Sequence, residues 1–114
     1  MSQETANRPL TRYETLLITL PEIQKEELES FLDRSGQSLT KFGGNLIKTT
    51  EWGRRRLSYE IKKQNEGLYY LLEYDGQDDC VAKFQEFLRL QSECLRYMTT
   101  RKDPRVESVI SQGD

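Results

Sequence analysis

The chain contains no histidine and only two cysteines, and these absences exclude much of catalytic and metal-binding chemistry. Histidine is the commonest general base near neutral pH and a favoured metal ligand. Cys80 and Cys94 do not form a CxxC pair, so we expect no zinc site. We expect instead two reduced, structural thiols in a reducing compartment.

The sequence also lacks long apolar runs and a dominant sign of charge. No apolar run approaches the length that crosses a bilayer, and the first dozen residues lack the apolar centre of a secretory signal. We therefore expect no membrane span and no export or transit segment. The 17 basic and 19 acidic side chains nearly cancel, although a balanced sum can hide local segregation. The length of 114 residues predicts one domain with a small core and an ionic surface.

Catalytic motifs are missing as well. The pair Asp78-Asp79 is typical of a helix cap, and Glu26-Glu27 is typical of a solvated helix face. No glycine-rich phosphate loop follows a strand, and no nucleophile has a plausible base. We predict that the protein is not an enzyme and uses no cofactor and no metal.

The hydrophobic period changes along the chain between the values of strands and helices. It predicts strands at residues 13–20, 45–62, 68–74 and 94–101, and helices at 22–42 and from Asp78 or Asp79 to about 91. We expect Gly43-Gly44 to end the first helix, and Asp78 or Asp79 to cap the second. The order β-α-β-β-α-β predicts an α+β, ferredoxin-like fold, with a four-stranded antiparallel sheet and two helices on one face. We expect residues 1–11 to form a flexible arm, 12–102 the domain and 103–114 a flexible tail.

The stretch from 45 to 62 is predicted to be one long, bent strand. Its apolar phase runs through Leu46, Lys48, Thr50 and Trp52, and then changes after Gly53 to a second phase. A change by one residue at a glycine is typical of a β-bulge, so we expect Leu57, Tyr59 and Ile61 to be core residues. Residues 63–67 are predicted to be the hairpin loop, with Gly67 available for positive φ.

Three adjacent arginines, Arg54 to Arg56, follow Gly53, and basic residues gather around them. Lys41, Lys48, Lys62 and Lys63 extend this first set, and a second set lies near the end of the chain: Arg89, Arg96, Arg101, Lys102 and Arg105. If both sets border the open face of the sheet, they form one surface that suits a phosphate backbone. The alternative is a solvated surface of mixed charge.

Trp52, Tyr69 and Leu71 form a second feature, which has two interpretations. They either fill a sheet that is covered on both faces, or form an apolar patch that docks a partner chain or stacks on a base. The third strand only weakly resembles an RNA-recognition motif, because it lacks the basic lead residue and the ordered aromatic pattern. Acylphosphatases share the order of elements, but their arginine-bearing glycine loop is absent after the first strand.

Four segments in order resemble the bacterial small-subunit ribosomal protein six family. They are Arg12-Tyr13-Glu14-Thr15, Gly53-Arg54-Arg55-Arg56-Leu57-Ser58-Tyr59-Glu60-Ile61, Lys63 leading to Gly67-Leu68-Tyr69, and Leu95-Arg96-Tyr97-Met98. The match covers residues 12 to 102, and Ser58 stands where the family usually has alanine. The arm before Arg12 resembles cyanobacterial or plastid members. The resemblance implies a cytoplasmic location on the ribosome, or one in the plastid stroma.

The resemblance implies a structural role in the small ribosomal subunit. Family members bind the central domain of small-subunit ribosomal RNA as a heterodimer with small-subunit ribosomal protein eighteen. Arg12, Arg55, Arg56 and Arg96 match family positions, whereas Arg54 occupies a variable position. Lys48, Arg54, Arg101 and Lys102 are added for their charge alone. The expected RNA contacts are therefore Arg12, Lys48, Arg54, Arg55, Arg56, Arg96, Arg101 and Lys102. The expected partner face is Trp52, Tyr69 and Leu71. The alternative is a ferredoxin-like, self-assembling or small-ligand regulatory module.

Overall fold

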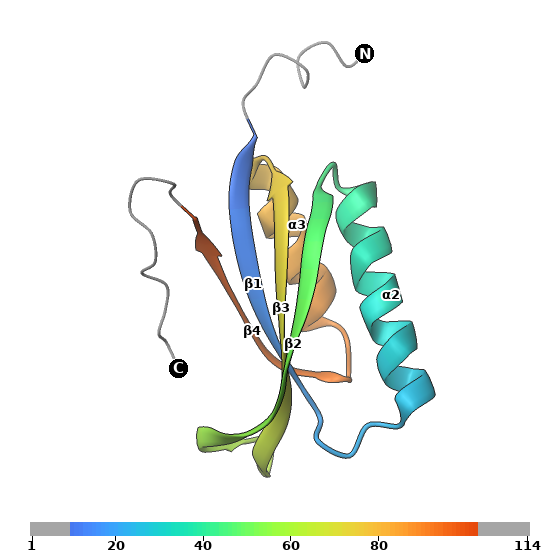
Figure 1. The fold of residues 1–114 in the computed structure, drawn as a ribbon, viewed down its shortest axis with the longest axis vertical. Coiled ribbons are helices and arrows are strands. Elements are labelled where there is room, and N and C mark those ends of the chain that lie inside the picture. The colour runs from blue at the N-terminus through green and yellow to red at the C-terminus, as the bar shows by residue number, and fades with distance from the viewer. Residues whose placement is uncertain (1–9, 103–114) are drawn as a thin grey trace.

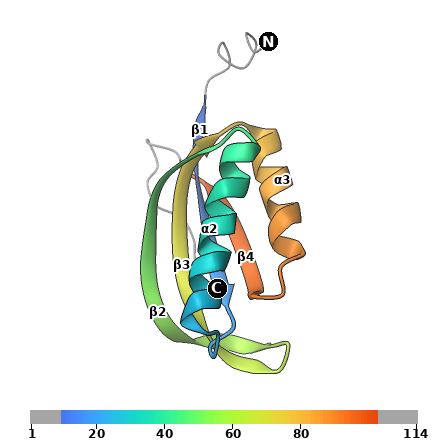
Figure 2. The same cartoon turned by 90° about the vertical axis from the view of Figure 1, so that its right-hand side faces the viewer.

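The computed structural model describes residues 10–102, which form four strands and two helices around one antiparallel sheet. The elements are β1 (Thr11–Thr19), α2 (Lys25–Lys41), β2 (Asn45–Ile61), β3 (Gln64–Gly76), α3 (Asp78–Arg89) and β4 (Cys94–Arg101). The sheet order is β2-β3-β1-β4, and both helices pack on one face, as Figures 1 and 2 show. The predicted ferredoxin-like fold is confirmed. The predicted arm (apart from residues 10 and 11) and tail lie outside the described residues.

The core lies between the sheet and the helices. Alternate residues of β1 and β3 point toward the helices, and Leu17, Leu72 and Tyr74 there are at most 1% exposed. The Tyr74 ring packs edge-on against Phe84 of α3, with ring centroids 5.7 Å apart. The hydroxyl of Tyr74 lies 2.8 Å from Thr15 Oγ1, so this buried polar group is satisfied within the core.

The helix ends follow local backbone chemistry, with one exception to the prediction. Helix α2 ends as expected, because Gly43 has φ of 90° and the Gly44 N–H donates to the Leu39 carbonyl at 2.7 Å. The N-cap of α3 is Gln77, so the prediction of an Asp78 or Asp79 cap was wrong. Asp78 lies in the first helical turn, where its carboxylate accepts a hydrogen bond of 2.6 Å from the Tyr13 hydroxyl.

The long, bent strand is confirmed, but it contains more irregularities than expected. Gly53 has φ of 90°, and the pairing of β2 with β3 shifts between Glu51 and Gly53, as a β-bulge requires. A second shift lies between Leu46 and Lys48. It turns Leu46 toward the core, opposite Tyr74, and leaves Lys48 opposite Glu73 on the other face, so their predicted common phase was wrong.

The hairpin turn lies earlier than predicted. Ile61 pairs with Gln64, so the turn consists of Lys62 and Lys63, with φ of 50° and 65°. Two central residues with positive φ are typical of the tight turns that join twisted strands. Gly67 lies inside β3, and positive φ is not the reason for glycine there. A Cβ at Gly67 would overlap Ile18 Cγ2 and lie 2.9 Å from the Thr19 carbonyl oxygen, so close strand approach requires glycine.

Before this turn, β2 contains a large bulge. Arg56 pairs with Glu66 and Ile61 pairs with Gln64, so residues 57–60 of β2 oppose the single residue 65 of β3. Leu57 and Ile61 still contribute to an apolar cluster, but Tyr59 is 60% exposed, so its predicted place in the core was wrong. The bulge breaks the alternation from which the core position of Tyr59 was predicted.

The hairpin curls across the lower end of the face that the helices leave open (Figure 1). Leu57 packs there against Ile18 of β1 and Leu95 of β4. A shift in the pairing of β1 with β4 next to Ile18 leaves Leu95 as an extra residue. Leu95 therefore belongs to this second cluster, while Tyr97 packs against the main core. The curled hairpin thus brings β2 onto β1 and β4, its non-neighbours in the sheet.

Candidate nucleic-acid interface

The face of the sheet opposite the helices, here called the open face, collects most of the predicted site residues. Residues that oppose one another on paired strands share a face, so the registers place them. The open-face residues are Glu14, Leu16 and Ile18 of β1, Lys48 and Thr50 of β2, Tyr69, Leu71 and Glu73 of β3, and Arg96, Met98 and Thr100 of β4. Helices α2 and α3 both pack on the other side (Figure 2).

The open face has two chemically different ends. The hairpin end is formed by Leu57, Tyr59, Ile61 and Arg96 with Ile18 beneath them, and these residues line a small cavity of about 20 Å³. Arg55 lies at this end of β2, opposite Gly67 of β3. The carboxylate end, at the start of β1, is formed by Arg12, Glu14, Glu73, Asp75 and Lys102. The cationic side chains at the two ends have different contact partners.

Two of the three predicted partner residues lie on the open face, and the third lies at the β2 edge. Tyr69 and Leu71 are half-buried on β3, opposite Gly53 and Thr50 of β2. Trp52 is the extra residue of the Gly53 bulge and is 41% exposed. The structure therefore provides an aromatic and aliphatic patch at the centre of the sheet and its β2 edge.

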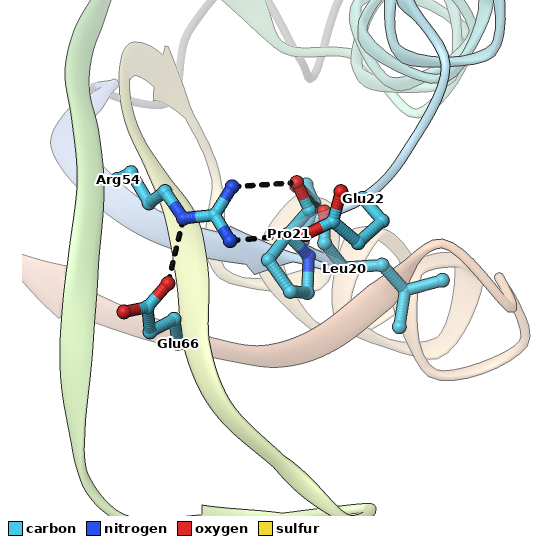
Figure 3. A network of polar contacts seen from close by, with 6 residues as sticks. Leu20, Pro21, Glu22, Arg54 and Glu66 are labelled. Carbon is cyan, nitrogen blue, oxygen red and sulfur yellow. Dashed lines mark hydrogen bonds and ion pairs between the residues drawn. The ribbon is translucent and has the colours of Figure 1, made fainter.

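Arg54 is committed to contacts within the protein (Figure 3). Its Nε lies 2.6 Å from Glu66, its Nη2 lies 3.0 Å from Glu22, and its Nη1 donates to the Pro21 carbonyl at 3.5 Å. These hydrogen bonds, that to Glu66 first, raise the pKa of Arg54. Arg54 thereby connects the hairpin to the segment between β1 and α2, and two carboxylates offset its charge.

Arg55 and Arg56 differ from their neighbour. The Arg55 guanidinium lies over the Trp52 ring, with Cζ 5.4 Å from the ring centroid, and its Nε lies 3.4 Å from the Trp52 carbonyl. Arg56 is exposed. Neither forms an ion pair with any described residue, and the same is true of Lys48 and Arg101. These four predicted contacts keep their positive charge available.

At the carboxylate end, the predicted RNA contacts are already paired. Arg12 Nε lies 2.5 Å and Nη2 lies 3.3 Å from the two oxygens of Asp75, and the hydrogen bond to Asp75 raises the pKa of Arg12. Lys102 Nζ lies 3.5 Å from Glu14 and 3.7 Å from Glu73. An incoming phosphate would have to replace a carboxylate at each of these cations.

Arg96 forms a third kind of contact. Its Nη1 donates to the Tyr59 hydroxyl at 2.6 Å, and its Cζ lies 5.6 Å from the centroid of the Tyr59 ring. The two contacts join the start of β4 to the bulge before the hairpin turn. Sequence reasoning missed Tyr59 as a site residue, because strand alternation assigned it to the core.

The two basic sets do not form a single surface. Arg89 pairs with Glu86 within α3, on the helix side of the sheet, and Arg101 pairs in register with Tyr13, whose side chain points toward the core. Arg105 lies outside the described residues. Only part of the second set therefore reaches the open face, through Arg96 and Lys102.

Other candidate chemistry is limited in the part of the chain that the structure describes. Cys80 and Cys94 are both free and buried, and burial raises the pKa of Cys94 to about 12. Among residues 10–102, no group of three or more histidine, cysteine or acidic residues is arranged to hold a metal ion. No helix in that range is both long and apolar enough to cross a membrane.

Comparison with known proteins identifies a single family. The family model described as Ribosomal protein S6 matches residues 12–101. Small ribosomal subunit protein bS6 of Heliobacterium modesticaldum is 29% identical over 94 residues, which cover 82% of this chain and 98% of that protein. The bS6 protein of Hyphomonas neptunium is 38% identical over 89 residues, covering 78% and 80% of the two chains.

Two further matches extend this result. The bS6 protein of Prochlorococcus marinus strain MIT 9312 is 33% identical over 91 residues, which cover 80% of this chain and 60% of that longer protein. The crystal structure of 30S ribosomal protein S6 from Thermotoga maritima superposes with a TM-score of 0.74 at 29% identity, covering 82% of this chain and 89% of that one. Sequence and structure therefore indicate the same relatives.

Proposed function

The chain belongs to the ribosomal protein S6 family, and from this premise we propose that it binds the central domain of small-subunit ribosomal RNA together with small-subunit ribosomal protein eighteen. Membership makes it a structural, non-enzymatic constituent of the small ribosomal subunit. The proposal concerns the binding partners: the RNA, the domain of it that is bound and the partner protein.

The observation that supports the proposal best is the state of Arg55 and Arg56. Both match family positions, Arg55 lies over the exposed Trp52, Arg56 is itself exposed, and neither is neutralised by a carboxylate among the described residues. Unpaired guanidinium groups on an exposed strand are suited to phosphate oxygens, which position a protein on RNA without reading its sequence. Lys48 and Arg101 are available in the same way.

Three of the other predicted RNA contacts already have carboxylate partners within the protein. Arg12, Arg54 and Lys102 bind RNA only if phosphates replace their present carboxylate partners. We therefore assign the main electrostatic contribution to the unpaired cations. Trp52, Tyr69 and Leu71 form the proposed partner face, since Trp52 is exposed, Tyr69 and Leu71 are half-buried, and aromatic residues are enriched in protein interfaces.

The RNA contact is tested by the double variant Arg55→Ala and Arg56→Ala, with the protein partner present. Each lost phosphate contact should lower the slope of log affinity against log salt by roughly one unit, so we expect a loss of about two. Arg89→Ala is the matched control, because that arginine is paired with Glu86 on α3. An unchanged slope in the double variant would refute the RNA contact.

The partner face is tested by the double variant Trp52→Ala and Leu71→Ala. We expect it to lose the heterodimer in a size measurement while the free protein stays folded, because both side chains lie outside the main core. Leu90→Ala is the control, since Leu90 is 65% exposed just after α3. A heterodimer that resists the double variant would move the partner to another face, and a homodimer indifferent to RNA would favour the self-assembling module.

A cyanobacterial or plastid-type origin also remains a proposal, supported only by the arm that precedes Arg12. The ribosome that carries the protein would then lie in a cyanobacterial cytoplasm or a plastid stroma. Relatives from several bacterial groups match at 29–38% identity, so the family comparison does not select among these origins.

A further inference from the structure

The segment 57–60 of β2 lacks regular pairing with its neighbouring strand. Four residues there oppose one residue of β3, so regular cross-strand pairing stops after Arg56 and resumes only at Ile61. A bulge of this size leaves backbone groups without ladder partners and allows the strand to bend. Its conformation must therefore depend on contacts made elsewhere.

Two contacts reach from this bulge to other strands. Leu57, at 9% exposure, packs on Ile18 and Leu95 and fixes the beginning of the bulge. Tyr59 lies two residues further along. Its hydroxyl accepts a hydrogen bond of 2.6 Å from Arg96, and its ring centroid lies 5.6 Å from Arg96 Cζ. Arg96 lies on β4, which is two strands away from β3 in the sheet order. The Tyr59–Arg96 contact thus spans the open face.

We infer that Tyr59 and Arg96 form a latch that holds the β2–β3 hairpin folded against the open face and fixes the orientation of Arg55 and Arg56. This inference rests on the proposed RNA-binding function for its consequence, but the latch itself is a property of the free protein. It makes Arg96 a positioning residue, although the residue was predicted as an RNA contact.

The position of the latch explains its importance. Arg55 and Arg56 come directly before the bulge, and Lys62 and Lys63 follow it after one residue, Ile61. A free bulge would let these cations move independently of the sheet, and ordering them on binding would cost conformational entropy. Because the latch fixes the bulge beforehand, it should strengthen RNA binding without contributing a phosphate contact.

The first experiment measures the latch in the full chain without RNA. We expect Tyr59→Ala and Arg96→Gln to lower backbone amide order parameters at residues 57–65 from about 0.85 toward about 0.6, with a smaller decrease in Tyr59→Phe, which keeps the ring. The matched control is Arg101→Gln on the same strand, since Arg101 makes no hydrogen bond or cation–π contact with the hairpin. Unchanged order parameters in Tyr59→Ala would overturn the latch.

The second experiment separates a positioning role from a phosphate contact. With the partner present, Tyr59→Ala and Arg96→Gln should weaken RNA binding by a similar factor of roughly five to ten, with the salt slope unchanged. If Arg96→Gln lowers the slope by about one unit while Tyr59→Ala changes nothing, Arg96 is a phosphate contact and the latch inference is wrong.

The two proposals fail in distinguishable ways. If the unsubstituted protein does not bind RNA with its partner, the proposed function is wrong, and the order parameters still decide whether the latch exists. If it binds and its hairpin is as rigid in Tyr59→Ala as in the original, the function stands and the latch is rejected.

Discussion

At the hairpin end of the open face, Arg55 and Arg96 lie over the rings of Trp52 and Tyr59, whereas at the carboxylate end Arg12 and Lys102 lie against acidic side chains. An aromatic ring attracts a cation without cancelling its formal charge, but a carboxylate neutralises it. Arg12 and Lys102 are thus neutralised within the protein, whereas Arg55 keeps its charge available to a polyanion. Counting basic residues does not reveal this difference.

The hairpin end should be the more sensitive to packing, and Gly67→Ala tests it most severely. The new Cβ would overlap Ile18 and approach the Thr19 carbonyl to 2.9 Å, so we expect the free energy of unfolding to fall by about 2–3 kcal/mol. Gly36→Ala is the matched control, because its Cβ meets only Leu46 at 3.5 Å. Removing that helical glycine should raise the free energy of unfolding by about 0.5–1 kcal/mol. Urea unfolding measures both, and a neutral Gly67→Ala would contradict the close approach.

The variants Leu57→Ala and Glu73→Gln compare the stability that side chains contribute at the two ends. For Leu57→Ala we expect a loss of about 2 kcal/mol in unfolding free energy, because the side chain is buried against Ile18 of β1 and Leu95 of β4. At the carboxylate end, Glu73→Gln should cost less than about 1 kcal/mol, since its contact with Lys102 is 3.7 Å long and partly exposed. Equal losses in the two variants, measured by thermal or urea unfolding, would remove the distinction between the ends.

Asp75→Asn tests the carboxylate end alone. The substitution removes the charge that faces Arg12, and the expected loss of unfolding free energy is about 1 kcal/mol at low salt. The loss should shrink in high salt, because a half-exposed pair is screened. If instead the cost is independent of salt, the contact acts as a neutral hydrogen bond.

The fold was predictable from the sequence because hydrophobic period is a local property. The alternation in β1 and β3, the apolar stripe of α2 and the glycine bulge at Gly53 all depend on near neighbours. The predicted position of the hairpin turn was wrong for two reasons. Lys62 and Lys63 adopt positive φ although lysine does not signal it, and Gly67 was interpreted as the turn residue. Its glycine serves a contact with β1, far away in the chain.

The sequence predicted on which face of the sheet the candidate side chains lie, but not the electrostatic state of the basic ones. Alternation placed Tyr69 and Leu71 on the open face, as the registers bear out. It did not show that Asp75 would neutralise Arg12, because the two are 63 residues apart and meet only through the register of β1 with β3. That pairing was in principle accessible, since in an antiparallel pair the start of one strand faces the end of the other.

The smallest predicted effect concerns the buried thiol beside the hairpin end. Cys94 has its pKa raised from 9.0 to about 12, mainly by burial, so the folded protein holds this proton more tightly than the unfolded chain. Its contribution to stability is complete only well below pH 9 and is lost as the pH rises toward 12. At pH 9 the loss should be about 0.4 kcal/mol.

The difference in unfolding free energy between the original protein and Cys94→Ala, followed from pH 8 to 10, isolates this contribution from other titrating groups. A difference that stays constant over that range would show that the thiol is not desolvated. Cys80 serves as an internal comparison, because it is a second thiol whose pKa is raised by burial. It lies elsewhere in the fold, beside Gly44 and Gly76 near the start of α3.

Strand β2 lies at the edge of the sheet, and its 17 residues would give another molecule a long row of unpaired backbone groups. Three breaks in its register, near Ile47, at Trp52 and across residues 57–60, interrupt that row. Exposed Lys48 and Arg54 to Arg56 add charge along it. The irregularities that shape the hairpin therefore also oppose edge-to-edge aggregation, and a variant with a straightened β2 should form fibrils or oligomers more readily.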